Sequence, residues 1–160
     1  MLGLLALLVL RAGWHFLRKL SPARLVDISL VRVSVEITLY GLAAAHLVPE
    51  LMTFAGQNFD IVAGITAGLM GWLVRRGKVS KTVLLVWHLG PLGLLGNIAR
   101  LAVLAVPSPL QQLAFEQPNV AVLRFPFAWL AAFAVPAVLL SHAAGLMQWL
   151  GRNGRSAAIE

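Results

Sequence analysis

The fold is decided by residues 61–106, which read IVAGITAGLMGWLVRRGKVSKTVLLVWHLGPLGLLGNIARLAVLAV. Two apolar runs, 61–74 and 82–106, flank a short segment that carries four basic residues: Arg75, Arg76, Lys78 and Lys81. Two further apolar runs, 28–51 and 125–150, lie on either side of this unit. A membrane-spanning helix needs about 20 mostly apolar residues. The pattern therefore predicts an all-α integral membrane protein, a single helical domain that crosses the bilayer four times.

The composition supports this class of protein. Hydrophobic residues make up 59% of the 160 residues and charged residues only 12%, which is about half the charged fraction of a typical soluble domain. The net charge of +7 introduces nucleic-acid binding as one interpretation of the composition. However, most basic residues sit beside apolar runs, where anionic lipid headgroups attract them. We therefore expect a lipid bilayer as the partner and no nucleic acid. The absence of Cys excludes disulfides and thiolate metal sites.

The basic residues also predict the orientation of the spans. Three segments outside the spans are rich in Lys and Arg: 18–24, 75–81 and 152–155. The other two, 52–60 and 107–124, contain one basic residue between them, Arg124. Cytoplasmic loops of membrane proteins are enriched in Lys and Arg. Loop 75–81 and the C-terminus are therefore expected in the cytoplasm.

The second apolar run is short for a span. Residues 61–74 cover only about 21 Å at helical rise, whereas the hydrocarbon core is roughly 30 Å thick. We expect this helix to start below the outer surface, with Asp60 as its N-cap. The polar segment 53–60 would then dip into the outer leaflet, which requires that protein or water satisfies its backbone.

Residues 1–20 leave two alternatives open. Met1–Leu10 is apolar, but Arg11 and His15 follow at the centre of the segment. A charge in the middle of the membrane is costly, so the first interpretation is an interfacial or partial helix. The second interpretation is a fifth span. A secretory signal would carry its positive charges before the apolar run rather than after it.

Glycines in the middle two spans recur at steps of three or four residues, which can place them on one helix face. They form two sets: Gly64, Gly68 and Gly71 in the second span, and Gly90, Gly93 and Gly96 in the third. Small residues let helix backbones approach closely in membranes. The sets therefore predict helix contacts, either within this chain or with another membrane subunit or a second copy. Pro91 and Pro136 are predicted to bend the last two spans.

Polar side chains inside the spans are the candidate functional residues, because their burial in hydrocarbon is costly without partners. Counting residues from the span ends places one group in the inner half of the membrane: Arg32, Glu36, Tyr40, His88 and His142. The structural interpretation is that Arg32 and Glu36, four residues apart, neutralise one another. The alternatives are a proton- or ligand-handling site, or haem or another pigment held by His88 and His142.

A second polar group is predicted in the outer half of the membrane: Glu50, Asn58, Asp60, Asn97, Arg100, Glu116 and Arg124. Asp60 and Arg100 have similar calculated depths, so we expect them to form a charge pair that pins the segment before the second helix. The functional alternative is a pocket for an anionic headgroup or a small polar ligand, since Arg binds carboxylate and phosphate through two parallel hydrogen bonds.

Sequence motifs for catalysis are absent. The chain has no GxSxG elbow, no HExxH, no P-loop and no GxGxxG after a strand. No catalytic residue and no metal ligand is therefore predicted.

Two stretches resemble bacterial multi-pass membrane proteins of unassigned activity. They are Leu51-Met52-Thr53-Phe54-Ala55-Gly56-Gln57-Asn58-Phe59-Asp60-Ile61 and Arg124-Phe125-Pro126-Phe127-Ala128-Trp129-Leu130. Those proteins often continue Trp-Leu-Pro, whereas this chain has Trp129-Leu130-Ala131. The resemblance covers most of the chain after about residue 30. It implies a bacterial inner-membrane location and the same topology, but no activity or cofactor.

These observations favour a non-enzymatic role, as a small integral subunit or assembly partner of a larger membrane complex. A small oligomeric transporter or proton-coupled carrier is the alternative function, and a haem- or pigment-binding protein is a third.

Overall fold

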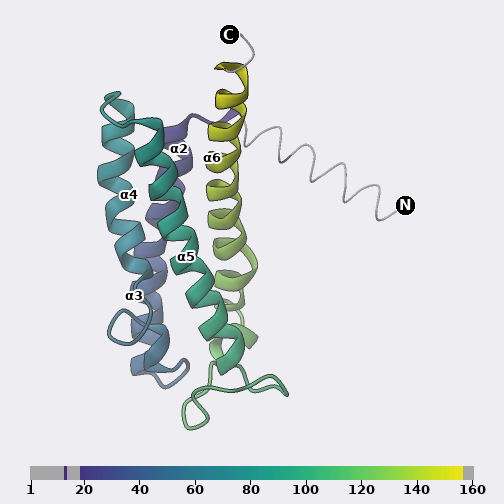
Figure 1. Ribbon diagram of the computed structural model, residues 1–160. Coiled ribbons are helices and arrows are strands. Elements are labelled where there is room, and N and C mark those ends of the chain that lie inside the picture. The colour runs from purple at the N-terminus through teal and green to yellow at the C-terminus, as the bar shows by residue number, and fades with distance from the viewer. Residues whose placement is uncertain (1–12, 14–18, 157–160) are drawn as a thin grey trace.

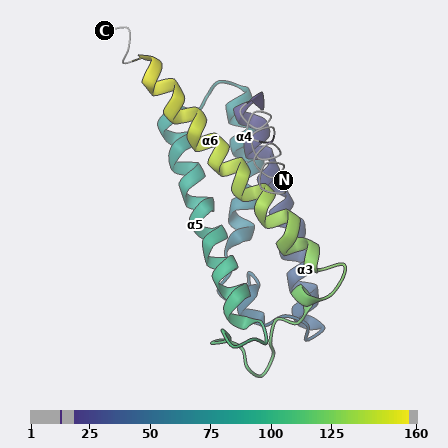
Figure 2. The ribbon, with the colours of Figure 1, turned by 90° about the vertical axis from the view of Figure 1, so that its right-hand side faces the viewer.

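The chain folds into helices that run along one common direction (Figures 1 and 2). The computed structural model describes residue 13 and residues 19–156, and this part of the chain contains no strand. The all-α prediction is therefore confirmed. The two alternatives for residues 1–20 fall almost entirely outside the described residues.

In the described part of the chain, four long helical segments make up the bundle. The first consists of α2 (Pro22–Asp27), the 3-10 turn η1 (Ile28–Leu30) and α3 (Val31–Ala44), which follow one another without a gap. The second is α4 (Asp60–Arg75), and the third is α5 (Lys81–Ala105). The fourth begins with the π-helical segment η4 (Leu130–Ala134) and continues as α6 (Val135–Ser156). Short 3-10 turns, η2 (Glu50–Met52) and η3 (Ala121–Leu123), lie in the connecting loops.

The two ends of the bundle differ in character. The α4–α5 turn, α2 and the C-terminal end of α6 lie together at one end (Figure 1). We call this the basic end, because Arg24, Arg75, Arg76 and Lys78 belong to it. The opposite end, with loops 45–59 and 106–129, is called the loop end. This arrangement has the alternation of basic and non-basic connections that was expected from the sequence.

Among the described residues, two helices are long and apolar enough to cross a membrane, Lys81–Ala105 and Leu130–Leu150. These match two of the four predicted spans. The other two segments differ from them. Residues 22–44 form a helical stretch of about 35 Å at 1.5 Å per residue, interrupted by η1. Helix α4, with 16 residues, reaches only about 24 Å.

The first helical segment begins and ends earlier than the predicted span 28–51. Its start is set by Ser21, whose hydroxyl accepts a hydrogen bond from the Arg24 N–H at 3.4 Å, with Pro22 at the first helical position. Its end is set by His46, which has a φ of 58°. The Leu47 N–H bonds to the Leu42 carbonyl at 2.9 Å, which is the hydrogen bond that closes a helix C-terminus.

The segment before α4 folds back along α3, as the short second run predicted. The Asn58 side chain bonds to Glu36, two turns before the end of α3. However, the predicted N-cap is wrong by one residue. Asp60 is the first helical residue, and Phe59 precedes it without a side-chain cap. The Asp60 carboxylate has another partner, described below, while the Asn58 side-chain oxygen accepts from the Asp60 N–H at 3.2 Å.

The glycines of α4 create a close helix contact within the chain. A Cβ added at Gly64 would lie 2.7 Å from Val33 Cγ2, and one at Gly68 would lie 3.6 Å from a Leu30 methyl group. The first set of glycines therefore packs α4 against η1 and α3. The glycines of α5 make no such close contact within the described part of the chain. A Cβ added at Gly90, Gly93 or Gly96 would meet nothing within 4 Å there.

The apolar core lies in the half of the bundle near the loop end. It is built by α3, α5, α6 and both loops, and its buried members are Leu39, Leu42, Val48, Met52, Leu95, Ile98, Leu101, Ala105, Ala121 and Val138. Between this core and the basic end, the interior contains buried polar side chains beside apolar ones such as Leu25, Val26 and Ala67.

Candidate functional site

A buried ion pair joins α3 to the start of α4. Arg32 Nη1 lies 2.6 Å from Asp60 Oδ1, and the two side chains are 2% and 6% exposed. The same nitrogen donates to the Pro91 carbonyl of α5 at 3.0 Å, and Nη2 lies 3.2 Å from Nε2 of His142 on α6. Arg32 therefore connects all four helical segments of the bundle.

This pairing corrects the expectation that Asp60 pairs with Arg100. The depth count began the first span at Ile28, whereas the helix begins at Pro22. Arg32 thus lies about 15 Å along the helical stretch, and its long side chain extends its reach further. Arg100 instead donates from Nη2 to the Asn97 side-chain oxygen at 3.2 Å, at an exposed position.

Glu36 has its own partner on the folded-back segment. Asn58 Nδ2 donates to Glu36 Oε1 and also to the Met52 carbonyl, the latter at 3.1 Å. Glu36 is 1% exposed and Asn58 is fully buried. Each charge of the expected Arg32–Glu36 pair therefore bonds across to residues 58–60 rather than along its own helix. The other carboxylate oxygen of Glu36 has no hydrogen-bond partner among the described residues.

The two histidines predicted for the inner half are in contact. Their Nδ1 atoms are 2.9 Å apart and both rings are buried. His142 Nε2 also lies 3.3 Å from the Ser29 hydroxyl, a residue that the sequence analysis did not single out. Ser29 precedes Arg32 by nearly one helical turn and so shares its face. The spacing between Ser29 and Arg32 was therefore the feature of the sequence that could have identified Ser29 as a member of the site.

The hydrogen-bond chemistry fixes which nitrogen carries each ring proton. A guanidinium only donates, so His142 Nε2 accepts from Arg32. His142 must then carry its proton on Nδ1 and donate it to Nδ1 of His88. His88 consequently carries its own proton on Nε2. This buried N–H has no hydrogen-bond partner among the described residues.

The histidine pair does not fit a haem iron between the rings. Two axial nitrogens on opposite sides of one metal would be separated by about 4 Å, twice a metal–nitrogen bond, whereas these atoms are hydrogen-bonded at 2.9 Å. No cluster of three or more His, Asp or Glu side chains suited to a metal ion occurs in the described part of the chain.

The structure merges part of the two predicted groups into one network, which we call the buried polar network: Ser29, Arg32, Glu36, Asn58, Asp60, His88 and His142. The remaining predicted residues lie outside it. Tyr40 is 52% exposed and stacks on Phe54, with ring centroids 5.0 Å apart. Asn97 donates to the Gln57 carbonyl at 2.9 Å. Three others are exposed near the loop end: Glu50, Glu116 and Arg124.

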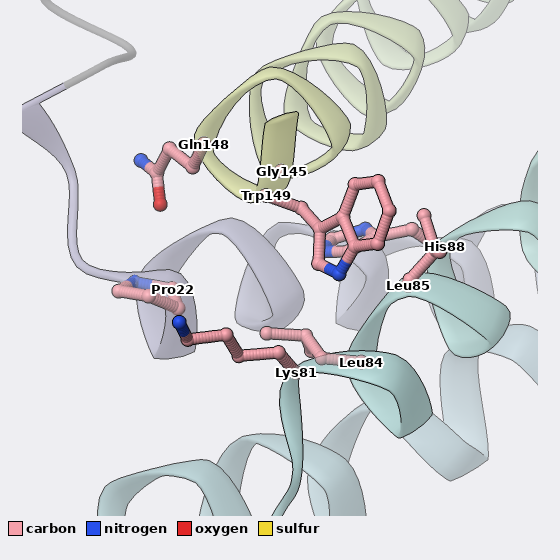
Figure 3. Close-up of a pocket in the computed structure, with 8 residues that line it drawn as sticks. All are labelled: Pro22, Lys81, Leu84, Leu85, His88, Gly145, Gln148 and Trp149. Atoms are coloured by element: carbon pink, nitrogen blue, oxygen red, sulfur yellow. The ribbon is translucent and has the colours of Figure 1, made fainter. Parts of the chain in front are cut away.

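A small cavity lies on each side of the buried polar network. The basic-end cavity, of about 40 Å³, is lined by Pro22, Lys81, Leu84, Leu85, His88, Gly145, Gln148 and Trp149 (Figure 3). The mid-bundle cavity is of similar size and is lined by Val31, Arg32, Val35, Glu36, Asp60, Leu95, Ile98, Ala134, Val135 and Val138. His88 thus borders one cavity, and the Arg32–Asp60 pair borders the other.

An apolar groove continues from the mid-bundle cavity toward the loop end. The two share Val35, Ile98 and Val135, and the groove extends past Leu42 and Phe127. Its walls are almost entirely apolar side chains.

Comparisons of the chain with protein-family models, with curated proteins and with solved structures found no match.

Proposed function

We propose that the chain is a four-span inner-membrane protein of bacterial type, with the basic end in the cytoplasm. Three observations support this placement. Residues 22–44 form a helical stretch long enough to span the hydrocarbon, and Lys81–Ala105 and Leu130–Leu150 are both apolar and of spanning length. The short helix α4 is completed by the folded-back segment, whose polar groups bond to α3 and α5. The basic turn and the C-terminal end of α6 share one side (Figure 1).

Within the membrane, the chain acts as a non-enzymatic subunit or assembly partner of a larger complex. The observation that carries this proposal is the open face of α5, made by Gly90, Gly93 and Gly96. Among the described residues, a Cβ at any of these three positions would meet nothing within 4 Å, whereas a Cβ at Gly64 or Gly68 of α4 would meet Val33 or Leu30. A small-residue face lets another helix approach closely, and van der Waals packing and lipid entropy favour its association there.

The buried polar network supports a structural rather than a catalytic role for its charges. Arg32 and Asp60 neutralise one another, and Arg32 also bonds to Pro91 of α5 and His142 of α6. Buried charges that bond to one another fix the relative position of helices, and removal of one partner is strongly destabilising.

A matched pair of glycine substitutions tests the assembly role. Gly93→Leu fills the open face of α5, while Gly41→Leu adds the same side chain at an exposed position of α3 that also has nothing within 4 Å. Both proteins are extracted in mild detergent, and bound chains are identified by native mass spectrometry. We expect a second membrane chain, either a partner or another copy, on the parent protein and on Gly41→Leu. Gly93→Leu should lose it.

A monomer from both variants and from the parent would reject the assembly role. Retention of the partner by Gly93→Leu would show that association does not use the α5 face.

The second candidate function is a proton-coupled carrier, and the pair of cavities favours it. His88 borders one cavity and Arg32, Glu36 and Asp60 border the other, so ionisable groups link two spaces within the bundle. The Glu36→Gln variant, reconstituted in liposomes with a pH-sensitive dye inside, tests this function. A carrier loses proton flux with this variant, whereas an assembly partner shows none in either form.

A further inference from the structure

The basic-end cavity is lined in part by His88, whose buried ring carries a hydrogen-bond donor without an acceptor among the described residues. His88 is 1% exposed, and the tautomer imposed by Arg32 and His142 leaves its proton on Nε2. That nitrogen has no partner in the described part of the chain, although its ring edge sits where a Gly145 side chain would be. An unsatisfied buried N–H costs free energy, so a ligand in this cavity gains most by presenting an acceptor oxygen.

The walls and the rim of the cavity define the rest of the ligand. Leu84 and Leu85 of α5 and Trp149 of α6 supply apolar walls around the cavity (Figure 3). Lys81 is the one charged residue among the described residues that line the cavity, and it is exposed. The site therefore favours an amphiphile with a negative group at the surface.

The spacing of the two polar groups matches a glycerophospholipid. Lys81 and His88 are two helical turns apart, about 10 Å along α5, with Lys81 nearer the basic end. The charged phosphate of a diacyl phospholipid lies at the membrane surface, and its neutral ester carbonyls lie deeper, next to the acyl chains. At about 40 Å³, the cavity accommodates a small group such as an ester carbonyl and not a whole headgroup.

We propose that the basic-end cavity binds an anionic ester-linked phospholipid of the adjacent leaflet, with an ester carbonyl oxygen accepting from His88 Nε2–H and the phosphate paired with Lys81. This inference depends on the membrane placement proposed above, and it adds a specific lipid site that the placement does not require.

Lipids that differ only in their ester carbonyl oxygens test the carbonyl contact. The full chain in mild detergent is titrated with dioleoyl phosphatidylglycerol or with its diether analogue, which has the same headgroup and chains but no carbonyl. Bound lipid is counted by native mass spectrometry. We expect the ester lipid to bind about tenfold more tightly, the value of one hydrogen bond to an otherwise unpaired buried donor. Phosphatidylcholine should bind more weakly than phosphatidylglycerol, and inorganic phosphate alone should not bind.

Four variants, one of them a control at a neighbouring position, assign the effect to this cavity. His88→Phe should bind ester and ether lipids equally. Leu84→Trp, which fills the cavity and leaves His88 in place, should lose both, whereas Val83→Trp, at the neighbouring exposed position, should bind like the parent. Lys81→Gln should lose the preference for phosphatidylglycerol over phosphatidylcholine but keep the preference for ester over ether.

If His88→Phe does not fold, the nitrogen-15 resonance of His88 Nε2 in the parent protein replaces it, with a shift expected on adding the ester lipid and none with the ether lipid. Equal binding of both lipids by the parent, or an unchanged preference in Leu84→Trp, would overturn the proposal. Binding of inorganic phosphate alone would overturn the lipid source. A chain that stays soluble without detergent would instead reject the membrane placement, so the two failures are distinguishable.

Discussion

Substitution of Asp60 by Asn should destabilise the bundle far more than the same substitution in an exposed ion pair. Asp60 neutralises Arg32 where the two side chains are 6% and 2% exposed. With Asn at position 60, the guanidinium keeps its bonds to the Pro91 carbonyl and to His142 but loses its counter-charge. Breaking a buried pair by removing one partner costs about 3–5 kcal/mol.

We expect the lower part of that range, because the Asn side-chain oxygen still accepts one hydrogen bond. A loss of about 3 kcal/mol lowers the folding equilibrium constant roughly a hundredfold. Titration of the protein from mild detergent into sodium dodecyl sulfate, followed by far-ultraviolet circular dichroism, measures this change in the free energy of unfolding.

The chain contains its own matched control. Asp27 and Arg75 form an ion pair of 2.7 Å, almost the same length, but their side chains are 32% and 52% exposed. Asp27→Asn should therefore cost no more than about 1 kcal/mol. Adding Arg32→Met to Asp60→Asn should recover part of the loss, because the guanidinium that lost its counter-charge is then removed as well. Equal costs for Asp60→Asn and Asp27→Asn would refute the reasoning that the buried pair holds the bundle together.

Further substitutions separate close contacts from open positions. Gly64→Ala should cost about 1–3 kcal/mol in the same titration, because the new methyl group would lie 2.7 Å from Val33 Cγ2 and 3.0 Å from its backbone nitrogen. Gly41→Ala should be neutral or stabilise by up to about 1 kcal/mol, since its Cβ meets nothing and Ala favours a helix; a loss there as large as at Gly64 would contradict the packing argument. Tyr40→Phe and Arg100→Gln should each change the free energy of unfolding by less than about 0.5 kcal/mol, because both side chains are exposed. A large loss in the free energy of unfolding for Arg100→Gln would support the ion pair between Arg100 and Asp60 that was expected from the sequence.

The apolar runs predicted the helical segments well because a span must be long and apolar, and that requirement is visible in the sequence. The shortness of the run 61–74 also predicted the folded-back segment before α4. The sequence did not predict where α3 ends. His46 takes a left-handed backbone conformation without being glycine, so no residue type marked the turn. Ser21 and Pro22 mark the start of the helix, whereas the apolar run predicted that the span begins at Ile28.

The sequence predicted most residues of the buried polar network, but not which of them bond to one another. Counting residues along straight spans gives the depth of a Cα atom, whereas Arg32 acts about a side-chain length away from its own Cα. The error at the helix start added to this difference and placed Arg32 and Asp60 in separate layers. The contact between His88 and His142 needs the relative rotation of α5 and α6, which no spacing within one helix determines.

The placement of the chain in a membrane can be tested directly because the sequence has no Cys. Single cysteines are introduced by Lys78→Cys in the α4–α5 turn and by Ser108→Cys in the loop at the opposite end, and intact cells are treated with a membrane-impermeant maleimide. The account predicts labelling at position 108 in intact cells and at position 78 only after the membrane is opened. Labelling of both positions from the same side would contradict the four-span bundle.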